Sequence, residues 1–142
     1  FEYLWGGPNG MYASRLGERW RHTNRLRTIL EHGVIIAGGS DANVTRPEPM
    51  LGIHAAVNHP NPDERIGVQA ALRMMTLDAA YAGKNDDRHG SIQPGKEASF
   101  AVLDDNLFEA PTDRLRFIEV EETWSLGRRV FQRHVAASSA AE

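Results

Sequence analysis

Asp41 is the carboxylate whose position in this sequence best suits chemistry. It follows Gly38-Gly39-Ser40 and the apolar run 34–37 (VIIA), which is typical of a buried parallel strand. Active sites of α/β sheets and barrels lie at the carboxyl ends of such strands. Asp41 could there ligate a metal ion or act as a general base, or it could be a loop residue that stabilises a turn.

A complete catalytic set is not evident around Asp41. A catalytic zinc site uses about three protein ligands, and no two of the six histidines are spaced i, i+2 or i, i+4. His54 and His59 would be separated by roughly 140° on a helix. We therefore expect His54 on a helix surface and His59 just before the turn at Pro60, and neither as a ligand. Ser40 has no histidine placed to activate it.

The composition excludes several classes of protein. Sixteen basic and nineteen acidic residues give a net charge of −3, which argues against a nucleic-acid-binding face. No apolar run approaches the ~18–20 residues of a membrane span. The absence of cysteine excludes disulfides and fits a cytoplasmic location. The 142 residues are too few for a complete (β/α)8 barrel of ~250 residues, and a start at Phe1 leads us to expect a missing upstream segment.

Periodicity and turn residues predict an α/β segment over residues 1–88 and an all-β segment over 89–134, followed by a flexible tail at 135–142. Helices are expected at 12–20, 51–57, 64–75 and 77–82. Another helix is expected between a cap at Thr23 and an end at His32-Gly33. Strands are expected at 99–104, 118–125 and 129–134, the last two joined by a turn at 126–128.

Four segments between residues 24 and 131 carry short motifs in a fixed order. They are 33–41 (GVIIAGGSD), 76–80 (TLDAA), 90–104 (GSIQPGKEASFAVLD) and 126–131 (LGRRVF). Their order and spacing resemble the C-terminal part of the metal-dependent amidohydrolases. The segments 1–5 (FEYLW) and 49–53 (PMLGI) are similar to the family 3 branch, which includes N-substituted formamide deformylases.

The resemblance implies an α/β fold made of the last βα units of a (β/α)8 TIM barrel (residues 1–88) and part of a small β-sandwich (89–134). It implies that Asp41 follows the eighth barrel strand, binds a divalent metal, expected to be zinc, and acts as general base. The substrate would be a small amide, formamide or cyclic amide. The family's other metal ligands have no counterpart here, so we expect the fragment itself to be inactive and to bind no metal.

Two departures from the family pattern are Ser99, in place of an aspartate, and Asp78, in place of an asparagine. Two alternatives to the enzyme remain open, a non-catalytic binding or oligomerising module and a pseudoenzyme of the same fold. An incomplete barrel would expose a strand edge and apolar helix faces, so we expect a homo-oligomer.

Overall fold

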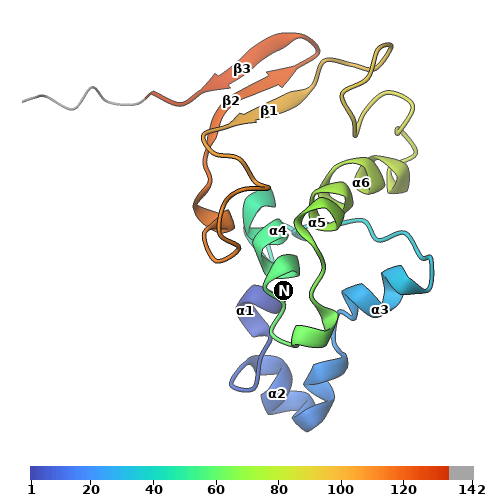
Figure 1. Ribbon diagram of the computed structural model, residues 1–142, viewed down its shortest axis with the longest axis vertical. Helices are drawn as coiled ribbons and strands as arrows, with labels where there is room; N and C mark the ends of the chain where they lie inside the picture. The colour runs from blue at the N-terminus through green and yellow to red at the C-terminus, as the bar shows by residue number, and fades with distance from the viewer. Residues whose placement is uncertain (135–142) are drawn as a thin grey trace, which may run out of the picture.

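The fold, a computed structural model that describes residues 1–134, has a helical part and a small sheet beside it (Figure 1). The predicted tail at 135–142 lies outside the described residues. The helical elements are α1 (Glu2–Trp5), α2 (Met11–Leu16), the 3-10 helix η1 (Gly17–His22), α3 (Leu26–Glu31), α4 (Pro49–Val57), the 3-10 helix η2 (Pro62–Glu64), α5 (Val68–Met75) and α6 (Leu77–Ala82). The sheet contains β1 (Phe100–Leu103), β2 (Val120–Ser125) and β3 (Arg128–Gln132), with the 3-10 helix η3 (Leu115–Phe117) before β2.

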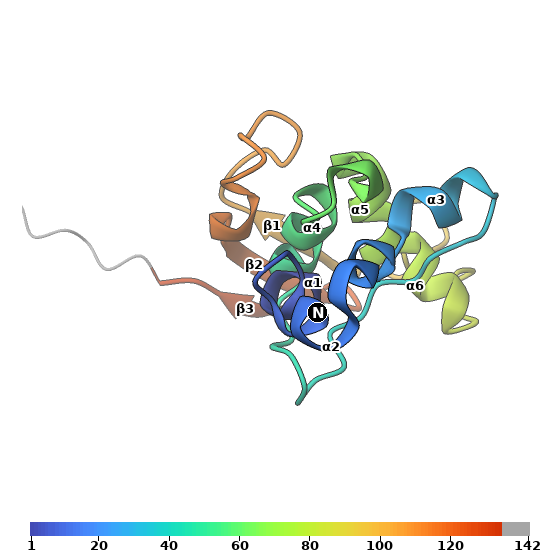
Figure 2. The same cartoon turned by 90° about the horizontal axis from the view of Figure 1, so that it is seen from below.

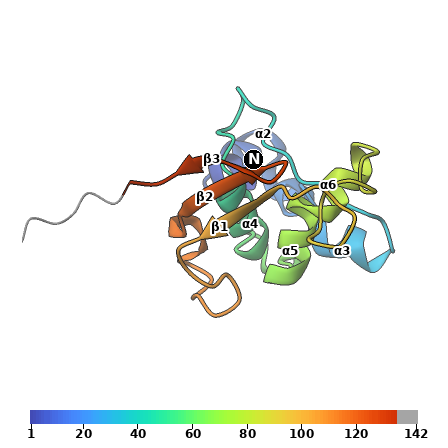
Figure 3. The same ribbon diagram turned by 90° about the horizontal axis from the view of Figure 1, so that it is seen from above.

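The core forms where α4 and α5 meet the segment that connects β1 to β2. Ile53 on α4, Met74 on α5 and Leu115 on η3 are among its buried side chains, and Leu115 is fully buried. In the views from below and from above, α4 lies between β1 and α5 (Figures 2 and 3). Pro49 at the first turn of α4 suits a position where a helix amide has no partner. The apolar sequence of α4 thus reflects contact on several sides.

The three strands form an antiparallel sheet in the order β1-β2-β3. Phe100 on β1 pairs with Trp124 on β2, and their rings stack with centroids 5.8 Å apart. Leu126 and Gly127 both have positive φ, of 52° and 75°, as the tight turn between β2 and β3 requires. The predicted strands and hairpin are therefore confirmed to within two residues.

Residues 34–37 are not the buried strand that the sequence predicts. Val34 and Ile35 are 53% and 49% exposed, and the segment forms no strand ladder with the other described residues. A parallel strand receives its hydrogen bonds from neighbours on either side, and residues 1–134 supply only the antiparallel sheet formed after residue 100. The apolar run is an extended segment that has no partner strand among residues 1–134.

The helix predictions hold with three changes. The predicted helix over 12–20 is α2 followed by the 3-10 helix η1. Arg25, not Thr23, is the N-cap residue of α3, and the Thr23 hydroxyl instead donates to the Trp20 carbonyl at 2.7 Å. The helix α3 ends at Glu31, with His32 as its C-cap, and Gly33 follows with a φ of 73°, as predicted. The predicted helix over 64–75 is instead the short η2 and the separate α5. Asn61 caps η2 by accepting a hydrogen bond from the Asp63 amide at 3.2 Å, so Asp63 is not the cap we expected. Among the helices of residues 1–134, none has the length and apolar character to cross a membrane.

Candidate active site around Asp41

Asp41 begins a tight turn at the end of the extended segment. Its φ is 48°, in the left-handed region that aspartate tolerates better than most residues. The Val44 amide donates to the Asp41 carbonyl at 2.7 Å, and the Thr45 hydroxyl donates to the Ser40 carbonyl. The backbone on both sides of Asp41 is therefore fixed by local hydrogen bonds.

The segment that leads to Asp41 is attached to α5. The Gly38 amide donates to the Met74 carbonyl at 2.8 Å. A side chain at Gly38 would collide with the sulfur of Met75. A larger residue at this position would require the methionine side chains at the end of α5 to move.

The carboxylate of Asp41 is exposed and has no hydrogen bond or ion pair with another side chain of residues 1–134. Its oxygens are available as hard ligands of the kind that divalent metals accept. Within the same residues, however, no three His, Asp or Glu side chains lie together in a metal-binding arrangement. Asp41 thus fits the part of one ligand, and the described chain does not supply a whole metal site.

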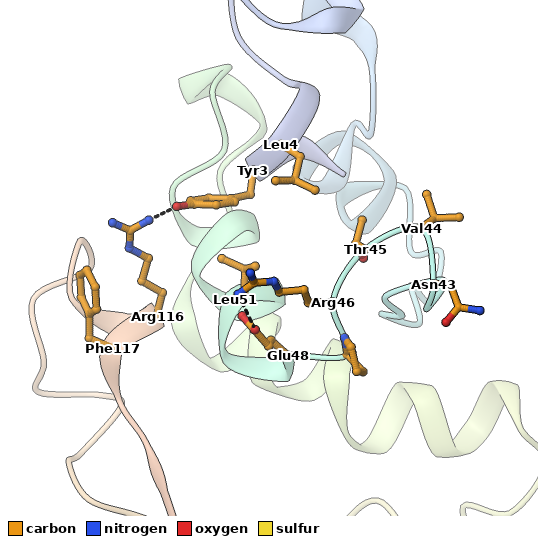
Figure 4. A pocket seen from close by; sticks show the side chains of 11 residues that line it. Tyr3, Leu4, Asn43, Val44, Thr45, Arg46, Glu48, Leu51, Arg116 and Phe117 are labelled. Carbon is orange, nitrogen blue, oxygen red and sulfur yellow. Dashed lines mark hydrogen bonds and ion pairs between the residues drawn. The ribbon is translucent and has the colours of Figure 1, made fainter.

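The loop after Asp41 lines an open pocket of about 770 Å³ (Figure 4). We call it the Arg46 pocket; its lining residues are Tyr3, Leu4, residues 43–48, Leu51, Arg116 and Phe117. A smaller hollow of about 260 Å³ shares Tyr3, Leu4, Leu51 and residues 45–48 with it and reaches Gly39 and Ser40. The pocket therefore continues to the residues that directly precede Asp41.

Two arginines from distant parts of the chain contribute to the Arg46 pocket. Arg116 donates a hydrogen bond to the Tyr3 hydroxyl, and its guanidinium carbon lies 4.5 Å from the centre of the Phe117 ring and 5.3 Å from that of Tyr3 (Figure 4). Arg46 donates to Glu48 at 3.4 Å, but the Arg46 side chain is 82% exposed. Arg116 is therefore held in place more firmly than Arg46.

His54 is buried, contrary to our expectation of a helix-surface position. Its ring lies edge-on to Tyr3 with centroids 5.9 Å apart, and its Nδ1 lies 3.2 Å from the side-chain amide of Asn58. Burial lowers the pKa of His54, and the Thr112 backbone and the charge of Asp113 only partly oppose this effect. The lowered pKa favours the neutral form of His54, whose ring packs against Tyr3.

His59 is also fully buried, which the sequence did not indicate. Its Nδ1 accepts from the Asn61 amide at 3.1 Å, and its Nε2 lies 3.7 Å from Oε2 of the buried Glu2. The Asn24 side chain donates to the other oxygen of Glu2 at 2.7 Å. These contacts join α1 to the segment after α4.

Glu64 forms a second buried contact that the sequence did not reveal. Its carboxylate accepts from the Thr28 amide at 3.0 Å and from the Thr28 hydroxyl at 2.5 Å, and Arg25 lies 3.5 Å away. Burial alone would raise the pKa of Glu64, but these hydrogen bonds outweigh it and hold the pKa below its usual range. Glu64 thus caps α3, which has no cap from its own N-terminal residue.

The two departures from the expected motifs have structural roles in this chain. The Ser99 hydroxyl accepts a hydrogen bond from the Leu126 amide at 3.1 Å, which ties the start of β1 to the hairpin turn. Asp78 is buried and pairs with Arg73 at 2.9 Å, which joins α6 to α5. Neither residue contacts the Asp41 turn.

Comparison with known proteins identifies the family. The sequence pattern of the amidohydrolase family matches residues 3–131. The chain belongs to the amidohydrolase family. It is 30% identical over 130 residues to the putative amidohydrolase YtcJ of Bacillus subtilis, covering 84% of this chain and 25% of YtcJ. It is 30% identical over 138 residues to the N-substituted formamide deformylase of Arthrobacter pascens, covering 91% of this chain and 25% of that enzyme.

Further similarity extends to other members and to a solved structure. The probable imidazolonepropionase of Homo sapiens is 34% identical over 105 residues, covering 72% of this chain and 22% of that protein. An amidohydrolase from Thermotoga maritima superposes with a TM-score of 0.59 at 26% identity, covering 76% of this chain and 26% of that one. The chain thus spans about a quarter of the length of the relatives it matches. The resemblance read from the four motifs is confirmed.

Proposed function

We propose that this amidohydrolase segment is part of a metal-dependent hydrolase of non-peptide C–N bonds in small amides, formamides or cyclic amides. The exposed and unpaired carboxylate of Asp41, at the end of the Gly38–Asp41 segment, is the observation that carries the proposal. Relatives named as a formamide deformylase and an imidazolonepropionase support the reaction class.

In this proposal the carboxylate of Asp41 accepts a proton from the hydrolytic water as its oxygen attacks the carbonyl carbon. Asp41 then gives that proton to the amide nitrogen as the C–N bond breaks, so that the products are a carboxylic acid and an amine. A divalent metal, which we expect to be zinc and to have Asp41 among its ligands, supplies when bound a water of lowered pKa. The hydrogen bonds to the carbonyls of Asp41 and Ser40 hold the backbone that carries this side chain.

We further propose that 34–37 becomes a barrel strand when residues equivalent to the rest of the relatives' sequence are present. Support comes from the exposed Val34 and Ile35 and from the quarter-length coverage of the relatives. The 142-residue chain alone should then be inactive, bind no metal tightly and self-associate through its exposed apolar surface. A monodisperse monomer in light scattering would contradict the last point.

The test uses the enzyme produced from the full reading frame that contains these residues, loaded with zinc. We expect it to hydrolyse members of a panel of N-substituted formamides, acetamides and cyclic amides. Asp41→Asn should lower kcat by at least about 1000-fold, the upper range for loss of a general base, and should reduce the bound metal measured by mass spectrometry. Asp87→Asn, which changes another exposed aspartate, should leave both unchanged.

Two outcomes would overturn parts of the proposal. If the zinc-loaded protein hydrolyses no amide in the panel, the reaction class is wrong. If Asp41→Asn keeps more than a tenth of the wild-type kcat, Asp41 is not the general base, whatever the reaction class.

A further inference from the structure

The Arg46 pocket carries a cluster of groups that the proposed hydrolysis does not use. Three of its lining side chains are charged, Arg46, Arg116 and Glu48, so their sum is +1. They come from the turn after Asp41 and from η3, more than sixty residues later. A pocket whose charged residues give a net positive charge beside a candidate catalytic carboxylate suits a ligand with one negative charge.

Arg116 is already oriented for such a ligand. Tyr3 and Phe117 place their rings against its guanidinium, and Tyr3 accepts only one of its hydrogen bonds. Guanidinium has five N–H donors in a planar arrangement, and stacking on rings occupies none of them. Among residues 1–134 no carboxylate pairs with Arg116. Its remaining donors are therefore available to a planar anion.

The other residues that line the pocket indicate which class of anion would bind there. Leu4, Leu51 and Phe117 give the pocket apolar walls, and Glu48 offsets part of the positive charge at Arg46. Organic carboxylates combine a single charge and a planar acceptor pair with an apolar body. A phosphate dianion would meet too little positive charge and too much apolar surface.

We infer that the Arg46 pocket binds the carboxylate of the substrate through Arg116, with Arg46 as a second, more mobile contact. The substrate class is then an amide that carries a carboxylate on an apolar or aromatic body. This inference rests on the proposed function for the reaction, but the binding of the carboxylate does not depend on it. The smaller hollow, which joins the pocket to Gly39 and Ser40, provides the path from the bound carboxylate toward Asp41.

The first test measures binding without catalysis. Benzoate, its neutral isostere benzamide and inorganic phosphate are titrated into the 142-residue chain and followed by NMR. We expect benzoate to bind at least about tenfold more tightly than benzamide or phosphate, and Arg116→Gln to weaken benzoate binding by about 10- to 100-fold, the range for one charge-assisted contact. The matched control is Arg114→Gln, because Arg114 stacks 4.9 Å from Phe117 but does not line the pocket.

A second variant distinguishes the loss of a binding contact from unfolding of the protein. Tyr3→Phe keeps the ring and removes only the hydroxyl that orients Arg116, so benzoate affinity should fall by a few fold while the circular dichroism spectrum is retained. Equal binding of benzoate and benzamide would overturn the inference. So would benzoate binding that is unaffected by both variants, or affected equally by Arg114→Gln.

The second test uses the full-reading-frame enzyme with N-benzoylglycine and N-methylbenzamide, which differ by one carboxylate. Arg116→Gln should raise KM for N-benzoylglycine by about 10- to 100-fold with little change in kcat, and should leave N-methylbenzamide unaffected. Equal effects on both amides would refute a role in carboxylate recognition. Absence of any hydrolysis would count against the proposed function alone, since benzoate binding is measured separately.

Discussion

The buried carboxylate of Glu64 should be one of the largest single contributors to the stability of the helical part. It accepts two hydrogen bonds from Thr28, at 3.0 and 2.5 Å, and lies 5% exposed. Hydrogen bonds to a charged group contribute about 1.5–3 kcal/mol each, and their sum is reduced because both involve one residue. Arg25 adds little, since its side chain is 46% exposed. We therefore expect Glu64→Ala to lower the free energy of unfolding by about 3 kcal/mol.

The effect should depend on pH in a defined direction. Because the pKa of Glu64 is held below the usual 4.5, its ionised form stabilises the fold at pH values above about 4.5. That contribution is lost as the pH falls through the lower pKa of the folded state. The difference between wild type and Glu64→Ala, measured by urea unfolding with circular dichroism, should thus be largest near pH 7 and should narrow below pH 4.5.

Two comparisons sharpen this experiment. Glu18→Ala removes an exposed carboxylate that pairs with Arg21 on the surface, and it should cost less than about 0.5 kcal/mol. Glu64→Gln keeps one acceptor oxygen for Thr28, so the stability that it loses should lie between the losses in Glu18→Ala and Glu64→Ala. The reasoning fails if Glu64→Ala costs no more than Glu18→Ala at pH 7, or if its cost is the same at pH 3 as at pH 7.

Three further variants test the packing. Because burial lowers the pKa of His54, the unfolded chain takes up a proton near pH 6.5 before the folded chain does. The free energy of unfolding of the wild type should therefore decrease from pH 7 to pH 5.5. In urea titrations, His54→Gln should show a smaller decrease over the same pH range. Gly90→Ala should lower the melting temperature more than Gly95→Ala: both glycines have positive φ, but only at Gly90 would a Cβ lie 2.8 Å from neighbouring atoms. Leu115→Ala should cost about 2–5 kcal/mol in urea unfolding, because the side chain is fully buried.

The features that the sequence predicted well are local. Gly33 ends α3 and Leu126-Gly127 forms the hairpin turn because each turn requires a backbone conformation that few residues adopt. The helix α4 and the strand β2 were likewise predicted from the residues of the segments 51–57 and 118–125 themselves. The buried strand predicted before Asp41 is not formed by residues 1–134, and the role of Asp41 remains a proposal.

The features that sequence missed depend on residues far apart. The burial of Glu64 is explained by Thr28, 36 positions earlier, and the orientation of Arg116 by Tyr3, 113 positions earlier. A charged side chain with a distant partner and one without have the same sequence signal. The prediction of a buried strand at 34–37 was wrong because apolar residues predict burial whether or not a partner strand is present.

These distant contacts also determine where Asp41 lies. Glu64 holds α3, which leads into the extended segment, and the Gly38–Met74 hydrogen bond attaches the end of that segment to α5. Asp41 therefore depends on two attachments, neither of which touches its carboxylate. Weakening either one should displace the candidate catalytic group while leaving its chemistry intact. In the full enzyme, Glu64→Ala should accordingly lower kcat without changing the pH at which the rate is half-maximal, whereas Asp41→Asn removes the titrating base itself.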